Sequence, residues 1–452
     1  MGGRLFSLLT DSKLLLISYL FPPAGGVAVQ RALSMAKYLP HDGYEMHVLC
    51  CRNPAVPNLD PSLLKSIPPE VHVHRVFSPE LPYRMKQAVW GLLSSKRKAG
   101  GPATQTPRPA GKPSGIKTGI QAWIQAWMRR VLCPDPEVVW VPFALRRARQ
   151  LVRQYGIDTV MITAPPFSSL LVGLQLKREF PSIKFVADFR DGWLEYTLNA
   201  FDFHKNDYTL VRATAIEREV VTQANLITSV TSGNNSIMQQ RYPDLPAGKF
   251  ALIYNGYDPE SFAGFQPRQH GTGKVVIVHA GTLHTTTSPK SYFDALDNLP
   301  DNLRDQVETR VMGRITEVEA PELDNRRTTI RRYGFLPQPE VFRQLEEADY
   351  LLLIVHHAPA LGGKIFEYLA TGKPILAISP EHGEVARLIH ETGSGMCAYP
   401  STPGSIEAML TKAIESVRNG TPFCGNGRSS VERFNRRHQA TEYARLMRAA
   451  QR

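Results

Sequence analysis

Short apolar runs alternate with segments of helical periodicity in the first half of the chain. Residues 13–18 are typical of a buried strand, residues 27–39 have apolar side chains at helical spacing, and residues 47–50 form the next strand. This order predicts a parallel sheet with crossover helices. Further strands are predicted at 158–162, 184–187, 225–231 and 250–254. Ser168 and Ser169 are predicted to cap the helix that follows the first of these.

The same alternation restarts in the second half of the chain. Strands are predicted at 274–280, 310–314, 350–355 and 374–378, and helices at 340–348 and 433–448. Between the halves, Asn255-Gly256 is a turn signal and residues 263–273 have low hydrophobicity. A length of 452 residues also exceeds what one hydrophobic core usually organises. We therefore expect an α/β protein with domains at 1–255 and 256–430, followed by a terminal helix at 431–452.

The stretch from Gly362 to Pro374 places a glycine loop and a short helix between two predicted buried strands. Gly362 and Gly363 stand at the expected helix start, where free backbone N–H groups and the helix dipole favour an anion. Lys364 adds a positive charge, and Glu367 lies one turn further along the same face. This combination suits a nucleoside diphosphate, with phosphates at the glycines and ribose hydroxyls on Glu367. A buried helix with a solvated Lys–Glu pair is the plain alternative.

This helix resembles the donor-binding motif of retaining nucleotide-sugar glycosyltransferases of the GT-B fold, the large bacterial group often called family 4. The residues that carry the resemblance are Lys364, Glu367, Tyr368, Ala370, Gly372, Lys373 and Pro374. It implies two Rossmann-like, doubly wound domains facing across a cleft, with the C-terminal helix crossing back to the first domain. It also implies that Glu367 binds the ribose. Many members carry another glutamate eight positions earlier, which reaches the donor sugar, whereas this chain has Pro359 there.

Two segments of the first half match the same family in the expected order. A Pro-Pro-x-Gly-Gly loop that ends in Gly25 and Gly26 resembles the N-terminal glycine loop, which in the family approaches the donor phosphate and the acceptor. Glycines at such a place allow close backbone approach and tight turns. Residues 255–262 resemble the Asn-Gly-x-Asp linker between the two GT-B domains. A plain strand–helix turn is the alternative for the glycine loop taken alone.

The second half contains further candidate donor-binding residues. The family usually places an arginine and a lysine near the end of the first strand of its second domain, where they neutralise the diphosphate. Thr282 stands in place of the arginine, and Lys290 is the candidate lysine. Gly334, Phe335 and Leu336 resemble the loop whose backbone contacts the nucleobase. These residues complete the donor site that the resemblance implies.

A charged turn follows the predicted strand at 184–187. Asp188, Arg190 and Asp191 lie at or near its carboxyl end, where ligands gather in open α/β sheets. The carboxylates could bind sugar hydroxyls, or one of them could act as a base; a salt-bridged loop is the alternative. With the Pro-Pro-Phe-Ser-Ser run that starts at Pro165, the turn resembles a bacterial branch of the glycosyltransferase family. We therefore assign these three residues and Lys364 as catalytic candidates.

The formal net charge of +12 is concentrated in part of the first half. Between residues 96 and 149 there are eleven lysines and arginines against two acidic residues. Residues 94–119 are rich in Pro, Gly, Lys and Arg without periodicity, which predicts a disordered basic excursion. The segment at 120–130 is predicted to be a helix with Trp123 and Trp127 on one face. It could lie on an anionic membrane or be a core helix beside a solvated linker, and the sequence leaves both interpretations open.

Other features of the sequence exclude several classes of site. The five cysteines are scattered and form no CxxC pair, so neither a zinc site nor a disulfide framework is expected. His356-His357 lacks a third ligand at fitting spacing, and no metal is assigned. The basic stretch lacks the aromatic pattern of a nucleic-acid module. The apolar run at 14–21 is too short to span a bilayer, and a reducing, cytoplasmic location is expected.

The leading hypothesis is a glycosyltransferase that moves a sugar from a nucleoside diphosphate sugar to a hydroxyl acceptor. The resemblance implies retention of configuration, no metal or other cofactor, and a role in cell-surface polysaccharide or glycolipid synthesis. A lipid-linked acceptor and peripheral binding to the inner face of the membrane would follow from the basic segment. The alternatives are a nucleotide-sugar epimerase of the same fold and a catalytically inactive GT-B binding subunit, the latter favoured by Pro359 and Thr282.

Overall fold

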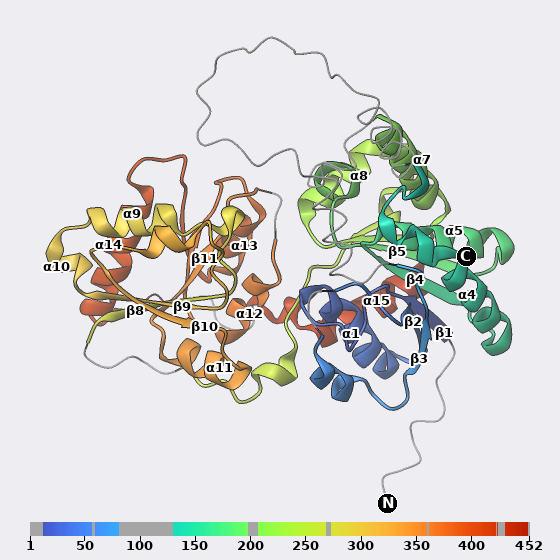
Figure 1. Ribbon diagram of the computed structural model, residues 1–452, viewed down its shortest axis with the longest axis horizontal. Helices are drawn as coiled ribbons and strands as arrows, with labels where there is room; N and C mark the ends of the chain where they lie inside the picture. Colours follow the sequence, from blue (N-terminus) through green and yellow to red (C-terminus); the bar gives the residue numbers. More distant parts are fainter. Residues whose placement is uncertain are drawn as a thin grey trace, which may run out of the picture. The chain divides into compact units, whose positions relative to one another are not determined.

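The structure is a computed structural model that describes residues 12–56, 59–80, 130–197, 207–267, 273–358, 361–421, 423 and 430–450. The chain divides into two compact units. The first comprises Met1–Ser229, Ile237–Leu252 and Ala440–Arg452, and the second comprises Val230–Ser236 and Ile253–Gln439. Each unit contains one parallel sheet with helices packed on it (Figure 1).

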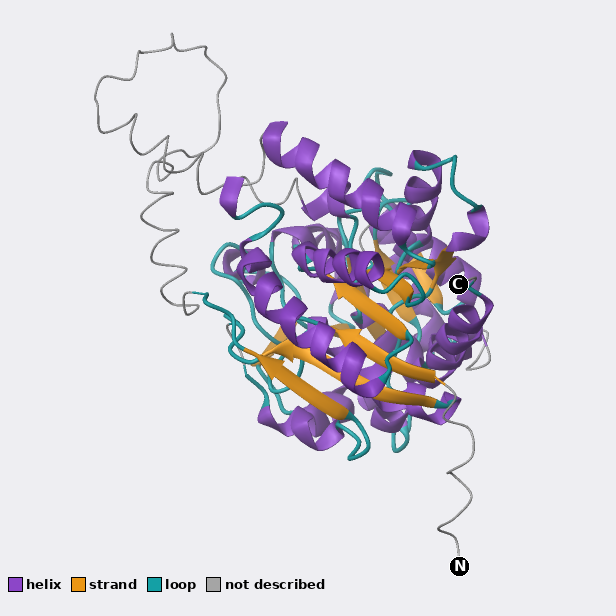
Figure 2. Ribbon diagram, turned by 90° about the vertical axis from the view of Figure 1, so that its right-hand side faces the viewer, coloured by secondary structure: helices purple, strands orange, loops and turns teal. Residues whose placement is uncertain are grey.

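The first unit contains a seven-stranded parallel sheet in the order β3-β2-β1-β4-β5-β6-β7. Its strands are β1 Ser12–Ile17, β2 Tyr44–Cys51, β3 His72–Val76, β4 Thr159–Ala164, β5 Lys184–Phe189, β6 Leu226–Ser229 and β7 Phe250–Leu252. The central strands are buried along most of their length because helices cover both faces, as Figure 2 shows. These helices are α1 Val27–Tyr38, α4 Val141–Tyr155, α5 Leu170–Glu179, α7 Asp207–Gln223, and parts of α8 Ser232–Arg241 and α15 Arg436–Ala449.

The second unit contains a six-stranded parallel sheet in the order β10-β9-β8-β11-β12-β13. Its strands are β8 Val275–Ala280, β9 Val307–Met312, β10 Thr329–Gly334, β11 Tyr350–Ile354, β12 Ile375–Ile378 and β13 Gly395–Ala398. Its helices are α9 Lys290–Asn298, α10 Asp301–Arg304, α11 Gln338–Glu347, α12 Lys364–Thr371, α13 Glu384–Thr392 and α14 Ser405–Arg418. Two parallel α/β sheets of this kind confirm the predicted fold class, which is GT-B-like.

The C-terminal helix returns to the first unit, as the predicted fold requires. From Ala440 onward α15 belongs to that unit. The Tyr443 hydroxyl donates a hydrogen bond to Asp188 of β5 (2.8 Å), and Lys184 Nζ donates one to the carbonyl of Met447 (2.8 Å). The side chain of Thr441 donates to Asp42, just after α1 (3.2 Å). These contacts fix the last helix against both the sheet and the region of α1.

Some local predictions differ from the structure. The prediction that a serine side chain caps α5 is wrong. The helix begins at Leu170 after a 3-10 turn at Phe167–Ser169, and no side chain forms a capping hydrogen bond. The excursion at 94–119 and residues 120–129 of the predicted helix lie outside the described residues. Within the part of the chain that is described, no helix is both long and apolar enough to cross a membrane.

The strand order places the candidate loops at equivalent positions of the two sheets. In the first sheet β1 lies between β2 and β4, so the chain reverses its direction of strand addition there. In the second sheet β8 lies between β9 and β11 in the same way. Open α/β sheets bind ligands outside the carboxyl ends of the strands at such switch points. A ligand-binding site is therefore expected at the loops that follow β1, β4, β8 and β11.

Candidate functional site

The candidate donor site of the second unit is built on α12, which follows the loop after β11. The helix begins at Lys364 without a side-chain cap and ends at Gly372, whose φ of 70° is the left-handed conformation that suits glycine. Gly362 and Gly363 precede its first turn, whose backbone N–H groups have no intrahelical acceptor. Most of the remaining helix is buried, whereas Glu367 is exposed. The sequence predicted this arrangement.

The ammonium group of Lys364 lies directly over Gly281, the residue that follows β8. A Cβ added at Gly281 would lie 1.1 Å from Lys364 Nζ, and its φ of 144° is a conformation that side chains rarely adopt. Gly281 therefore leaves the space that the ammonium occupies. Burial lowers the pKa of Lys364 to about 8, although nearby Glu367 acts in the opposite direction. Lys364 consequently remains a cation at neutral pH in a partly desolvated place.

The carboxylate of Glu367 completes this charged pair. Desolvation raises the pKa of Glu367, while Arg436 and Lys364 oppose the shift. Glu367 is exposed, so its carboxylate is accessible to a ligand on the same side of the helix as Lys364. A cation at the first turn with an accessible carboxylate three residues later can bind two different parts of one ligand.

A rigid layer of buried groups lies behind Lys364. The backbone N–H of Ala280 donates to the Tyr368 hydroxyl (2.8 Å), which ties the end of β8 to α12. His279 is buried, and its Nδ1 lies 3.1 Å from the carbonyl of Leu352. Burial, with a smaller contribution from Lys364, lowers the pKa of His279 to about 3, so this ring is neutral. The positive charge of the site therefore comes from Lys364 and not from the neighbouring histidine.

Closely packed glycines follow β8 and β9. A Cβ at Gly313 would lie 2.6 Å from the carbonyl oxygen of Gly281, so these strand ends approach too closely for a side chain. The N–H of Gly313 donates to the carbonyl of Gly334 (2.6 Å), where φ is 65°. Gly281 and Gly313 were not assigned to the site from the sequence. Gly281 directly follows a predicted strand and Gly313 lies near the end of the next one, which is the signal that could have identified them.

The remaining donor-site candidates fall into two groups. Phe335, which follows β10, is 91% exposed, and the neighbouring Leu336 is partly buried, so this loop presents an aromatic face to solvent. Lys290 lies at the start of α9 with its side chain 58% exposed, and it forms an ion pair with Asp294 (2.6 Å). No contact among the described residues joins Lys290 to Lys364. Pro359 lies outside the described residues.

Asp188, a catalytic candidate, lies fully buried inside β5 at the centre of a hydrogen-bond network. Arg31 of α1 donates to both its carboxylate oxygens (3.0 and 2.9 Å). Thr228 of β6 and Tyr443 of α15 donate to Oδ1 (2.6 and 2.8 Å). Burial alone would raise the pKa of Asp188, but the charge of Arg31 and these hydrogen bonds hold it below its usual value. Asp188 is therefore an ionised residue that joins α1, β6 and α15.

Arg190 and Asp191 lie in different surroundings from Asp188. The Arg190 guanidinium donates to the carbonyls of Ala28 and Pro165, and more weakly to that of Ala164 (3.4 Å). It thus joins the start of α1 to the loop after β4. Asp191 is exposed; desolvation raises the pKa of its carboxyl, and Arg190 opposes that shift. Of the three candidates in this turn, Asp191 has the most accessible side chain.

The glycine loop of the first unit leads into α1 beside Arg190. Gly26 precedes Val27 with a φ of 95°, and a Cβ there would meet nothing within 4 Å. The backbone conformation, and not a lack of space, is therefore what requires glycine at this position. Gly25 lies in the same turn. Since Arg190 binds the carbonyl of Ala28, the turn that carries both glycines is anchored to the loop after β4.

Sequence comparison finds a family match for one part of the chain. Residues 104–261 match the model of Glycosyltransferase Family 4. The match covers 158 of the 452 residues, which is less than half of the chain. The matched stretch includes Asp188, Arg190 and Asp191, whereas Lys364 and Glu367 lie outside it. No curated protein matches the sequence of this chain.

Solved structures resemble this chain over nearly its whole length. HepE of Anabaena, in complex with UDP and glucose, is 15% identical with a TM-score of 0.58, and the match covers 97% of this chain and 100% of HepE. WaaG, a glycosyltransferase involved in lipopolysaccharide biosynthesis, is 14% identical with a TM-score of 0.52, covering 97% and 98%. The N-terminal domain of Candida albicans trehalose-6-phosphate phosphatase is 12% identical with a TM-score of 0.60, covering 98% of both chains. At these identities the likeness shows the fold alone, and one fold can support several different functions.

Proposed function

We propose that this protein is a glycosyltransferase that binds a nucleoside diphosphate sugar on its second unit and transfers the sugar to a hydroxyl acceptor. The diphosphate contacts Gly362, Gly363 and Lys364, and the ribose hydroxyls bind Glu367. The observation that carries the proposal is the Lys364 ammonium over Gly281, where a side chain would exclude it. A cation in a partly desolvated place at a helix start suits a phosphate better than it suits a solvated surface pair.

The nucleobase is proposed to bind at the end of β10. Phe335 is almost completely exposed there, and Gly334 and Leu336 flank it. Backbone groups of Gly334 to Leu336 contact the base in this proposal. HepE has been solved with UDP-glucose, which supports a uridine nucleotide as the first donor to test here. Lys290 is retained as a second diphosphate ligand, which would require its exposed side chain to leave Asp294.

The proposed chemistry is stabilisation of the leaving diphosphate. As the bond between the sugar and the diphosphate breaks, negative charge develops on the phosphate oxygens. In this proposal Lys364 and the N–H groups at the start of α12 face that charge before the reaction begins, so little reorganisation is needed. This supply of positive charge from the protein supports the hypothesis of transfer without a metal ion. Retention of configuration is inferred from the family resemblance.

The acceptor side of the reaction is assigned to the first unit. We infer that Asp191 binds or activates the acceptor hydroxyl, because it is exposed and desolvation raises the pKa of its carboxyl, which makes the carboxylate a stronger base. Arg190 acts as a positioning residue that holds the Gly25-Gly26 turn. Asp188 is also assigned a positioning role, because its carboxylate already accepts hydrogen bonds from Arg31, Thr228 and Tyr443.

The acceptor is proposed to be lipid-linked, with the enzyme on the cytoplasmic face of a membrane during cell-surface polysaccharide or glycolipid synthesis. Support comes from the basic sequence between residues 96 and 149 and from Trp123 and Trp127. Vesicle co-sedimentation tests this proposal. The enzyme should bind anionic vesicles at low salt, dissociate at high salt and bind more weakly after Trp123→Ala/Trp127→Ala with unchanged thermal stability. Failure of the unmodified enzyme to bind at low salt would refute it.

A nucleotide-release assay tests the proposed donor site. The enzyme is incubated with individual UDP-sugars, and released UDP and any altered sugar are measured. Slow UDP release that is lost in Glu367→Ala supports transfer from this site. An epimerised sugar nucleotide without release would favour the epimerase alternative, and absence of both products together with retained UDP binding would favour an inactive binding subunit. Unchanged donor affinity in Glu367→Ala by calorimetry would refute the ribose assignment.

A further inference from the structure

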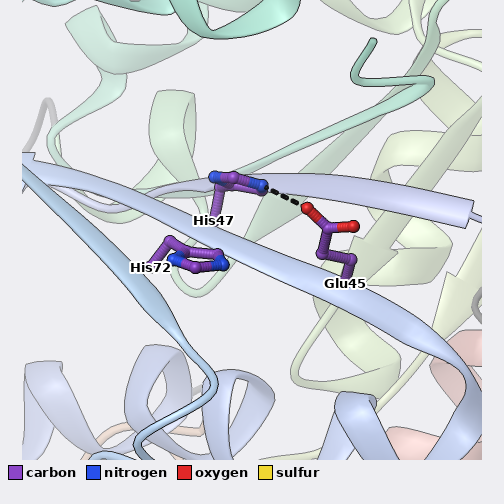
Figure 3. Close-up of side chains that lie close together, drawn as sticks. All are labelled: Glu45, His47 and His72. Carbon is purple, nitrogen blue, oxygen red and sulfur yellow. Dashed lines mark hydrogen bonds and ion pairs between the residues drawn. The ribbon is translucent and has the colours of Figure 1, made fainter. Parts of the chain in front are cut away.

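The edge of the first sheet carries a histidine cluster that the proposed sugar transfer does not use. Strand β3 is the edge strand, and His72 in it pairs directly with His47 of β2 in the parallel ladder. Glu45 lies two residues before His47, so the three side chains are on the same face of the sheet. Figure 3 shows the two rings next to each other, with the Glu45 carboxylate facing His47.

The donor atoms of this cluster are close enough to reach one ion. One atom from each of Glu45, His47 and His72 can be chosen so that all three lie within 4.8 Å of one another. His47 Nε2 is 3.1 Å from Glu45 Oε1, and the two rings have centroids 4.9 Å apart. Tetrahedral Zn²⁺ with bonds of about 2.0–2.2 Å places its ligand atoms roughly 3.3 Å apart. The His72 ring is stacked on that of His47 at an interplanar angle of 28°, so the exposed His72 side chain must rotate to bring one of its nitrogens to this spacing.

Neighbouring side chains fix the orientation of the central ring. His47 is fully buried, which favours the neutral imidazole that has a lone pair for a metal. Its Nδ1 lies 3.2 Å from His74 Nε2, and Tyr155 packs on it with centroids 4.4 Å apart. A metal-binding histidine usually forms a hydrogen bond through its second nitrogen in this way. His47 is therefore preorganised, while the more exposed His72 and Glu45 leave a path for the ion.

We propose that Glu45, His47 and His72 bind one divalent transition-metal ion of the Zn²⁺ class, with water completing the coordination. Two imidazoles and one carboxylate match the preferences of Zn²⁺ better than those of Mg²⁺ or Ca²⁺. His72 is the first residue of β3 and Glu45 the second of β2, so the site lies near the amino ends of these strands. The candidate loops of the sugar-transfer site lie at the carboxyl ends of the strands. The proposed ion is therefore remote from those loops, and its role is to join the edge strand β3 to the rest of the sheet.

The neighbouring Lys13 gives the proposal a directional test. Its Nζ lies 3.4 Å from Glu45 Oε2 and would repel a bound dication. Lys13→Met should therefore strengthen metal binding, whereas Glu45→Gln should weaken it because it removes the anionic ligand. If the cluster is held by hydrogen bonds alone and binds no metal, neither substitution should change the affinity of the protein for Zn²⁺.

The experiment uses the full-length protein, freed of metal and titrated with Zn²⁺ in competition with a chromophoric chelator. We expect one equivalent to bind, with a rise in Tm on addition of Zn²⁺. His72→Ala should weaken binding by about tenfold or more, since even loss of an outer-shell partner costs that much. His41→Ala is the matched control, because His41 is an exposed histidine of the same unit outside the cluster.

Three results would overturn the proposal. These are the absence of a bound equivalent, binding that His72→Ala and Glu45→Gln leave unchanged, and binding that His41→Ala weakens equally. The second and third results would identify an adventitious surface ion. If His72→Ala does not fold, the Zn²⁺ affinities of Glu45→Gln and Lys13→Met test the proposal, because both substitutions keep the approximate size of the original side chain. Cobalt(II) absorption gives a separate readout: bands of a histidine-bound ion should disappear in the Glu45 and His72 variants.

Discussion

Gly281→Ala should disable the donor site without unfolding the protein. The new Cβ would occupy the position of Lys364 Nζ, only 1.1 Å away. Because Nζ is the far end of a flexible side chain, the ammonium can move aside and the fold should survive. A φ of 144° adds a backbone cost of about 1–3 kcal/mol in stability. The variant should therefore have a lower Tm and retain a cooperative unfolding transition.

The expected loss of activity follows from the interaction that the displaced lysine no longer makes. A hydrogen bond to a charged group contributes about 1.5–3 kcal/mol. Since 1.36 kcal/mol corresponds to a tenfold change in rate, kcat/KM for the donor should fall by about 10- to 160-fold. Initial rates of nucleotide release at a series of donor concentrations give this quantity.

Two further variants separate the displaced ammonium from backbone strain. Gly404→Ala is the matched control, because Gly404 also has a positive φ (73°) in the second unit but open space around its Cβ. It should lose stability and keep activity. Gly281→Ala/Lys364→Ala should be no less active than Lys364→Ala alone, since both remove the same interaction. Additive losses, or a Gly281→Ala variant as active as the Gly404→Ala control, would refute the role assigned to Gly281.

Four other predictions follow from the site. Because the pKa of Lys364 is about 8, the ammonium is lost as pH rises through that value; kcat/KM should fall above pH 8, and Lys364→Arg should move this limb to higher pH. Arg31→Met leaves the buried Asp188 without its cation and should cost about 3–5 kcal/mol in urea unfolding, whereas Tyr443→Phe should cost about 1.5–3 kcal/mol. Asp191→Asn should reduce transfer while calorimetric nucleotide affinity stays unchanged; a parallel fall in affinity would make the turn structural. Phe335→Ala should raise the donor KM without lowering Tm, because Phe335 is 91% exposed.

The sequence predicted the fold because buried parallel strands are readable as apolar runs. The run at 350–355 became β11, and the glycine-to-glycine segment after it became α12 with Gly372 at its end. Strands β3, β10 and β13 were not predicted. Their sequences are HVHRV, TIRRYG and GMCA, and all three lie at sheet edges, where one side remains unpaired. The fourth edge strand, β7, was predicted because its segment is apolar. Continuous hydrophobicity thus identifies buried strands, and a polar edge strand lacks that signal.

The environment of each candidate residue was less predictable than its identity. The spacing of Lys364 and Glu367 on one helix is a local property, so the sequence was sufficient to pair them. The contact of Lys364 with Gly281 spans 83 residues and exists only because β8 and β11 are neighbours in the sheet. The pairing of Lys290 with Asp294 is local, at four residues, but the resemblance directed attention to the diphosphate instead.

Asp188 illustrates why a residue's place at a strand end does not determine its role. From sequence, Asp188 and Asp191 are equivalent acidic residues of one turn. In the fold, Asp188 points into the unit, where Arg31, Thr228 and Tyr443 come from three other elements and occupy its carboxylate. Tyr443 lies 255 residues away along the chain, so no local pattern could reveal that the carboxylate is already engaged. Because the Asp188 carboxylate holds the C-terminal helix in place, we propose that the chemical role in this turn belongs to the accessible Asp191.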